Sequence, residues 1–149
     1  MLLLVHHGDA VGPDIDPMRP LSSAGLSASA ALAETAAARG VRPVVIWHSG
    51  KIRAKQTAEL FLRACNPLAV FEAVHGLQPG DPARWMHERL LGSVRSILVV
   101  GHMPHLPALL SLLRGEPGDR VARDFPAHGC VALEADGEVW RETWRLTPR

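Results

Sequence analysis

Residues 2–8 read Leu2-Leu3-Leu4-Val5-His6-His7-Gly8, an apolar run that ends in two histidines and a glycine. A short apolar run bounded by a turn residue is typical of a buried β-strand. Such a strand delivers two imidazoles at its carboxyl end, where ligands bind in open α/β sheets. Because histidine exchanges protons and acts as a nucleophile near neutral pH, this stretch indicates an active site.

Strands and helices are predicted to alternate along the rest of the chain. After the first strand, over 2–7, further strands are expected over 44–47, 68–74 and 96–100, and a hairpin over 129–134 and 138–145. Helices are expected over 23–39, 51–64, 82–91 and 106–113. This order predicts an α/β layered fold with a largely parallel sheet. Trp140 and Trp144, four residues apart in the last strand, are expected on one face.

The composition is that of one soluble domain over residues 1–149. Hydrophobic residues make up 47% of the chain and charged residues 21%, and the net charge is +1. So small a charge does not favour nucleic acid or a membrane surface as a partner, and no apolar run approaches the roughly 20 residues of a bilayer span. Cys65 and Cys130 have no metal-binding spacing and are expected as buried free thiols, which is typical of a cytoplasmic protein.

Three predicted strands end in residues whose side chains can bind a ligand or transfer a proton: His6-His7-Gly8, His48-Ser49 and Gly101-His102. Because parallel strands end at the same edge of a sheet, these residues are expected close together. Arg53 falls in the first turn of the next helix, where a guanidinium beside free backbone N–H groups binds anions. The cluster predicts a site for an oxyanion, most simply a phosphoryl group.

Five segments carry these residues in order along the chain. They are His6-His7-Gly8-Asp9-Ala10, Arg19-Pro20-Leu21-Ser22-Ser23-Ala24-Gly25, Ser49-Gly50-Lys51-Ile52-Arg53-Ala54-Lys55-Gln56-Thr57-Ala58, Leu77-Gln78-Pro79-Gly80-Asp81 and Val99-Val100-Gly101-His102-Met103-Pro104. Together they resemble the motifs of the histidine phosphatase superfamily, and the short chain is most similar to its SixA-type phosphohistidine phosphatases. The resemblance implies a phosphoglycerate mutase-like fold, a three-layer α/β/α sandwich with a mostly parallel mixed sheet.

The resemblance also implies a role for each matching residue. His7 would be the nucleophile that forms a covalent phosphohistidine intermediate. His102 would stabilise the developing charge across the pocket, and Arg53 would hold two phosphoryl oxygens in its fork. Phosphate binding would be completed by His6, Gly8 and Arg19. Such a pocket is expected to work without a metal or another cofactor, because positioning and charge stabilisation carry phosphoryl transfer.

The chain departs from the family at His6, because the family's first signature residue is an arginine. A protonated His6 would retain part of the attraction for phosphate, whereas a neutral one would lose it, at roughly 2.7–4 kcal/mol for one oxyanion donor. The general acid differs too. Gln78 stands in the loop where many relatives carry a carboxylate, which leaves Asp81, Asp14 and Asp16 as candidates.

These features leave three functions open. A weak general acid suits a phosphoramidate, because imidazole leaves more readily than an alkoxide, so the leading prediction is a phosphatase acting on phosphohistidine in a protein. A small-molecule phosphomonoesterase of broad specificity is the first alternative. A non-catalytic phosphate-binding homologue, weakened by the change at His6, is the second.

The other histidines have simpler interpretations. His48 is expected to order the turn after its strand, and His105 either to line the pocket entrance or to begin a helix. Surface positions are expected for His75, His87 and His128. A zinc site built from His6, His7, His48 and His102 is disfavoured, because no carboxylate or thiolate stands at the matching strand ends and Arg53 would repel the cation.

Overall fold

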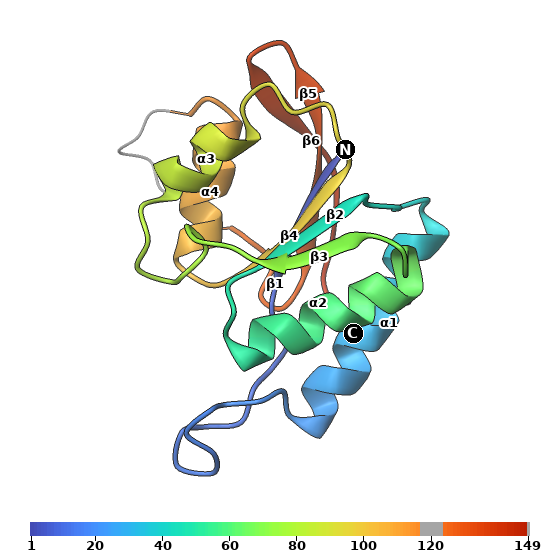
Figure 1. Ribbon diagram of the computed structural model, residues 1–149, viewed down its shortest axis with the longest axis vertical. Helices are drawn as coiled ribbons and strands as arrows, with labels where there is room; N and C mark the ends of the chain where they lie inside the picture. Colours follow the sequence, from blue (N-terminus) through green and yellow to red (C-terminus); the bar gives the residue numbers. More distant parts are fainter. Residues whose placement is uncertain (117–123, 149) are drawn as a thin grey trace.

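The computed structural model describes residues 1–116 and 124–148, in which six strands form one sheet of order β3-β2-β4-β1-β5-β6 (Figure 1). The strands are β1 (Leu2–His6), β2 (Val45–His48), β3 (Val70–Ala73), β4 (Ile97–Gly101), β5 (Cys130–Asp136) and β6 (Val139–Leu146). The helices are α1 (Ser23–Ala38), α2 (Ile52–Cys65), α3 (Ala83–Leu90) and α4 (His105–Leu113). Each expected element is therefore present, with bounds shifted by a few residues.

The sheet is mixed and mostly parallel, as predicted. Strands β3, β2, β4 and β1 run parallel, while β5 and β6 run antiparallel to their neighbours. Helices α1 and α2 cover one face, and α3 and α4 cover the other (Figure 1). These layers confirm the predicted three-layer α/β/α sandwich of phosphoglycerate mutase-like type.

Alternation along the central strands explains why they are apolar throughout. Leu2 and Leu4 of β1 pack towards α3 and α4, whereas Leu3 and Val5 pack towards α1 and α2. A strand covered by helices on both faces has no solvent-facing positions, so both sets of alternating side chains are apolar. The apolar run that opens the chain is thus the central strand of a two-sided core.

Close packing holds the amino end of α1 against the loop after β1. The side chain of Ser22 caps the helix by accepting the N–H of Gly25 at 3.0 Å. A side chain at Gly25 would place its Cβ 2.0 Å from the carbonyl oxygen of Asp9, and one at Gly8 would lie 2.3 Å from Oγ of Ser29. A glycine is required at position 25 because the two backbone segments touch there, and at position 8 the side chain of Ser29 occupies the space of a Cβ.

The expectation for the two tryptophans of β6 is wrong. Trp140 packs in the core under α3 and α4, while Trp144 packs against the core under α1 and α2. The register shifts between Ala132, opposite Trp144, and Leu133, opposite Glu142. This β-bulge inserts Thr143 as an extra residue, so residues on its two sides exchange faces.

Two simpler expectations concern the cysteines and the membrane. Cys65 and Cys130 are buried free thiols, as predicted, and burial raises their pKa values to about 11 and about 12. Among the helices of the described ranges, none has the length and apolarity needed to cross a membrane.

Candidate active site

The carboxyl ends of three neighbouring strands bring the predicted site together. His6 of β1 stands opposite Gly101 of β4, and Val100 of β4 stands opposite His48 of β2. The backbone N–H of His7 continues this pairing by donating to the carbonyl oxygen of Gly101 at 3.2 Å. The shared edge expected from the sequence is therefore present.

His7 is held in one neutral tautomer. Its Nδ1 lies 2.7 Å from the carbonyl oxygen of Gly8, and because a carbonyl can only accept, Nδ1 carries the proton. Nε2 then keeps its lone pair. The side chain is only 8% exposed, and burial, followed by the positive charge of Arg53, lowers the pKa of His7 to about 4, although the bond to Gly8 opposes this shift. A neutral imidazole with a free Nε2 is the form required of a nucleophile.

His102 lies across from His7, with the two ring centroids 5.0 Å apart. Its Nε2 is 2.6 Å from Oγ of Ser49, which also accepts the backbone N–H of Lys51. If the Ser49 hydroxyl donates to Nε2, the ring proton of His102 is on Nδ1, and this N–H is the one group without a partner. If Nε2 donated to Ser49 instead, both the Ser49 hydroxyl proton and the lone pair of Nδ1 would lack a partner. The first assignment is therefore favoured. Nδ1 is buried and has no partner in the described part of the chain, so it is a donor available to a ligand.

Two guanidinium groups supply the positive charge of the site. Arg53 lies in the first turn of α2, and its Nε is buried with no partner within residues 1–116 and 124–148. Burial and the charge of Arg19 both lower the pKa of Arg53, and the charge of Arg19 also lowers that of His7. Two positive charges that both act on His7 favour the binding of an anion.

Arg19 lies in the loop after β1. Arg19 has a φ of 49° and its Nε donates to the carbonyl oxygen of Val11 at 3.1 Å. A positive φ is uncommon for a residue with a side chain, and residues with strained backbones cluster at functional sites. The loop is anchored on α2, because the N–H of Leu21 donates to the side chain of Gln56 at 2.7 Å.

Thr57 connects the first strand to α2. Its hydroxyl accepts the N–H of Gly8 at 3.0 Å and donates to the carbonyl oxygen of Arg53 at 2.8 Å. These bonds hold the turn after His7 against the helix that carries Arg53. The N–H of Gly8 is thereby already engaged, so the predicted contact of Gly8 with phosphate stays a prediction.

Comparison with known proteins relates the fold to solved structures. No protein-family model and no curated protein matches the sequence. Among solved structures, the protein histidine phosphatase SixA complexed with tungstate superposes with a TM-score of 0.86 at 24% identity, covering 99% of this chain and 96% of that one. The SixA protein of Agrobacterium tumefaciens superposes with a TM-score of 0.81 at 25% identity, covering 99% and 97%. This is the histidine phosphatase fold.

The histidine phosphatase fold extends beyond SixA proteins. A mycobacterial glucosyl-3-phosphoglycerate phosphatase, whose structure contains VO3, superposes with a TM-score of 0.73 at 18% identity, covering 96% of this chain and 97% of the other. The resemblance inferred from the five sequence segments is confirmed by neighbours that span nearly the whole chain.

His6 is neutral in this histidine phosphatase fold. Its Nδ1 accepts the backbone N–H of His128 at 2.7 Å, so that nitrogen holds a lone pair. A protonated imidazole would have N–H groups on both sides and could not accept this bond. Burial, followed by His7, lowers the pKa of His6 to about 3. Of the two states left open by the sequence, the geometry selects the neutral one.

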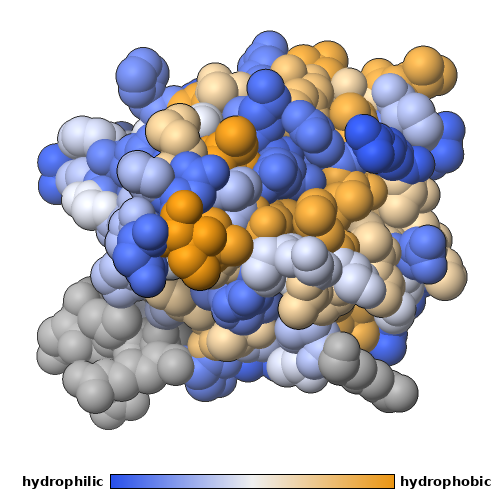
Figure 2. All heavy atoms as spheres, turned by 90° about the horizontal axis from the view of Figure 1, so that it is seen from below, coloured by the Kyte–Doolittle hydropathy of each residue, from blue (hydrophilic) through white to orange (hydrophobic). Residues whose placement is uncertain are grey.

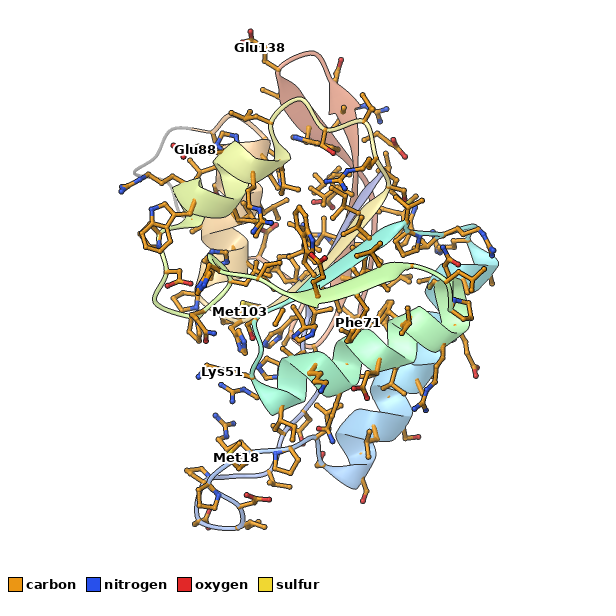
Figure 3. The ribbon with its side chains drawn as sticks, viewed as in Figure 1. Met18, Lys51, Phe71, Glu88, Met103 and Glu138 are labelled. Atoms are coloured by element: carbon orange, nitrogen blue, oxygen red, sulfur yellow. The ribbon has the colours of Figure 1, made fainter. Side chains whose placement is uncertain are left out.

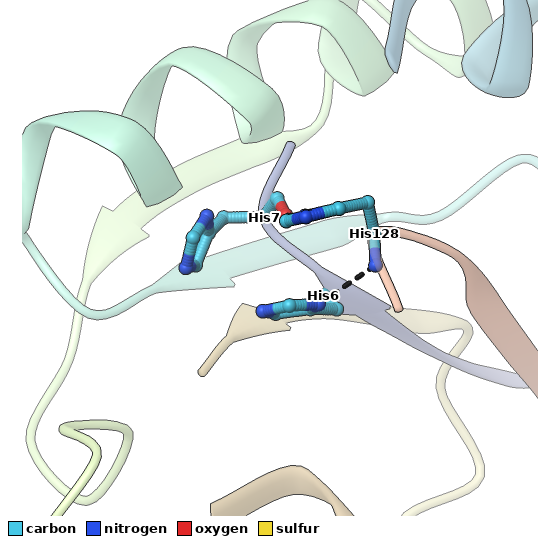
Figure 4. Close-up of side chains that lie close together, drawn as sticks. All are labelled: His6, His7 and His128. Carbon is cyan, nitrogen blue, oxygen red and sulfur yellow. Dashed lines mark hydrogen bonds between the residues drawn. The ribbon is translucent and has the colours of Figure 1, made fainter. Parts of the chain in front are cut away.

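His128 was expected at the surface, and that expectation is wrong. It is partly buried, its Nδ1 lies 2.7 Å from the carbonyl oxygen of His7, and its ring stacks on His6 with centroids 4.7 Å apart at 10° (Figure 4). No motif in the sequence marks this position. Only its place just before β5, the strand that pairs with β1, connects it to the site.

A metal ion has one candidate position within the described residues. One imidazole nitrogen from each of His6, His7 and His128 lies within 4.8 Å of the others. However, the Nδ1 of His6 accepts an amide proton, so its Nε2 carries the proton and is not free to coordinate. The nearby guanidinium of Arg53 would also repel a cation. The electrostatics of this cluster favour an anion.

Two of the three carboxylates proposed as general acids accept hydrogen bonds within their own loops. Oδ2 of Asp81 accepts the backbone N–H of Gln78 at 2.9 Å, and Oδ1 of Asp16 accepts that of Met18 at 2.9 Å. The amide of Gln78 in turn donates to the carbonyl oxygen of Ser49 at 2.7 Å, which secures the strand end beside His102. Gln78 therefore supports the site through the backbone of Ser49, the residue that follows β2.

Two other histidines have local roles. Nδ1 of His48 accepts the backbone N–H of Gly50 at 3.0 Å, so it orders the turn as expected. His105 begins α4 and is buried, with burial lowering its pKa.

A groove of about 360 Å³ opens beside Arg53. Met18 and Lys51 line it from the loop and from the start of α2, on the side of the molecule where both are labelled in Figure 3. The loop lies at the bottom of Figure 1 and faces the viewer in Figure 2, where apolar and polar residues are interspersed. Ile15 and Met18 are 74% and 66% exposed. The groove beside Arg53 is therefore both basic and apolar.

Proposed function

We propose that the protein is a phosphatase that removes phosphate from phosphohistidine on a protein, with His7 as its nucleophile. The observation that carries the proposal is the bond between Nδ1 of His7 and the carbonyl oxygen of Gly8, which leaves Nε2 unprotonated in a ring that faces His102 and feels the positive charges of Arg53 and Arg19. The proposal treats residues 1–149 as one catalytic domain that acts in the cytoplasm.

The first chemical step transfers the phosphoryl group to the enzyme. Nε2 of His7 attacks phosphorus and a P–N bond to His7 forms, while the P–N bond to the substrate imidazole breaks; that imidazole carries a proton on its other nitrogen, keeps the electron pair and leaves as a neutral ring. Arg53 and Arg19 bind the phosphoryl oxygens, and Nδ1–H of His102 donates to the charge that develops. His6 contributes one uncharged N–H in place of the family's guanidinium.

In the second step, water attacks the phosphohistidine intermediate. A new P–O bond forms, the P–N bond breaks, inorganic phosphate leaves, and His7 returns to its neutral form. The Gly8 carbonyl favours the same Nδ1–H tautomer before and after the cycle, so His7 needs no rearrangement between turnovers.

The substrate class follows from the chemistry of the leaving group. Asp81 and Asp16 accept hydrogen bonds within their own loops, which supports a reaction that needs little help from an acid. An imidazole leaving group meets that requirement better than an alkoxide does. The basic and apolar groove beside Arg53 suits a side chain presented on a protein surface.

The decisive experiment compares a phosphohistidine-containing protein with p-nitrophenyl phosphate as substrates. Wild-type protein should hydrolyse the phosphoramidate faster, and His7→Asn should abolish both the turnover and the acid-labile labelling of the enzyme by radioactive phosphate. Turnover that is equal in wild type and His7→Asn would contradict the proposal.

The loss of the guanidinium at His6 favours one other candidate, a phosphate-binding module without turnover. Tungstate binding with no hydrolysis of either substrate would support that candidate, particularly if His6→Arg then produced turnover. Faster hydrolysis of the ester than of the phosphoramidate would instead indicate a small-molecule phosphomonoesterase.

A further inference from the structure

His128 makes three contacts with the two histidines at the end of β1. Its backbone N–H donates to Nδ1 of His6, its ring Nδ1 donates to the carbonyl oxygen of His7, and its ring stacks on that of His6 (Figure 4). Both hydrogen bonds are 2.7 Å long. His128 therefore contacts both His7, the proposed nucleophile, and its neighbour His6.

These contacts determine which nitrogen of each ring carries a proton. The amide N–H can only donate, so Nδ1 of His6 is the acceptor and Nε2 of His6 carries the hydrogen. The carbonyl of His7 can only accept, so Nδ1 of His128 carries the hydrogen. A tautomer set by the partner of the opposite nitrogen is the usual way in which proteins orient an imidazole for function.

An arginine at position 6 could not take part in this arrangement. A guanidinium has no acceptor atom, so the N–H of His128 would lose its partner. Conversely, without the amide of His128, a neutral His6 could place its proton on either nitrogen. The histidine at position 6 and the position of His128 therefore depend on each other.

We propose that His128 is a positioning residue that holds His6 as a neutral Nε2–H donor, and that the two residues together take the place of the family's signature arginine. The inference rests on the proposed phosphatase function. His128 touches neither substrate nor phosphorus in this scheme. It acts through the proton of His6 and through the main chain of His7, so its loss should lower kcat more than it raises KM.

A matched pair of variants tests the proposal without changing charge. His128→Asn keeps a donor close to the position of Nδ1 and suits the φ of 56° at this residue. His128→Leu has nearly the same shape as asparagine but no donor. We expect His128→Asn to retain most of the turnover and His128→Leu to lose about 100-fold in kcat, with KM for the phosphohistidine protein within about threefold.

The tautomer of His6 provides a second readout, because it would not change if His128 only stabilised the fold. Long-range ¹H–¹⁵N NMR of the phosphate-free protein should report a protonated Nε2 and an unprotonated Nδ1 in wild type and in His128→Asn. His128→Leu keeps the backbone amide but loses the ring contacts with His6 and the carbonyl of His7 that hold this amide in place, so it should give a mixture of both tautomers. If His128→Leu does not fold, His128→Ala replaces it, and the wild-type spectrum alone remains a test.

Two results would overturn the proposal: a wild-type His6 protonated on Nδ1, or a folded His128→Leu with the kcat and the His6 spectrum of wild type. Failure of the phosphatase function would look different. In that case wild-type protein would hydrolyse neither substrate, while the tautomer of His6 and its dependence on residue 128 would still be observed.

Discussion

The hydroxyl of Ser49 lies 2.6 Å from Nε2 of His102 and orients the ring that faces His7. Ser49→Ala should lower kcat by about 10- to 100-fold, because His102 loses the partner that leaves its proton on Nδ1. Steady-state kinetics on the phosphohistidine substrate checks this expectation. Ser49→Thr keeps the hydroxyl and should retain more activity; equal kcat values for Ser49→Ala and wild type would remove Ser49 from the mechanism.

Arg53 is expected to act through its fork as well as its charge. Arg53→Lys keeps one positive charge but cannot hold two phosphoryl oxygens in parallel, so kcat/KM should fall by about 100-fold or more. Arg63→Lys makes the same substitution at an exposed position in the last turn of α2 and serves as the control. A comparable loss of kcat/KM in both variants would mean that the substitution acts on α2 in general and not on the fork of Arg53.

Acid should destabilise the fold through its buried imidazoles. Burial lowers the pKa of His6 and of His102 to about 3 and that of His7 to about 4, against about 6.5 in the unfolded chain. Below pH 6.5 these three imidazoles become protonated in the unfolded chain but stay neutral in the folded chain. Stability is therefore full above pH 6.5 and decreases as the pH falls towards these folded values, by about 2 kcal/mol per imidazole at pH 5.

Urea unfolding at pH 7.5, 6 and 5 measures this loss. His6→Asn should give a shallower decrease, because it removes one of the three imidazoles while its side-chain oxygen can still accept the amide of His128. His75→Gln, at an exposed position, should leave the slope as in wild type. A free energy of unfolding that does not change between pH 7.5 and pH 5 would refute the prediction.

The contact between α1 and the loop after β1 should not tolerate a side chain. Gly25→Ala would place a Cβ 2.0 Å from the backbone oxygen of Asp9, so the loop that carries Arg19 must shift. We expect about 1–3 kcal/mol of destabilisation and a rise in KM. Gly80→Ala, where a Cβ meets no atom of the described structure within 4 Å, is the control and should change neither thermal stability nor kinetics.

Much of the fold could be predicted because its signals are local. The apolar runs of β1 and β4 mark buried strands by themselves. The common edge for His7 and His102 followed from one further rule, that parallel strands end together. The face of Trp144 did not follow, because the bulge at Thr143 arises from pairing with β5.

The sequence by itself determined the sandwich, the edge at which the histidines meet, and the position, His6, at which the chain departs from the histidine phosphatase motif that it resembles. Only the tertiary structure decided the protonation state of His6. Its neutral state depends on an amide 122 positions away in the chain, which reaches it because β5 pairs with β1. Protonation in a buried site depends on the partner of each nitrogen, and such a partner is set by packing that no local pattern encodes.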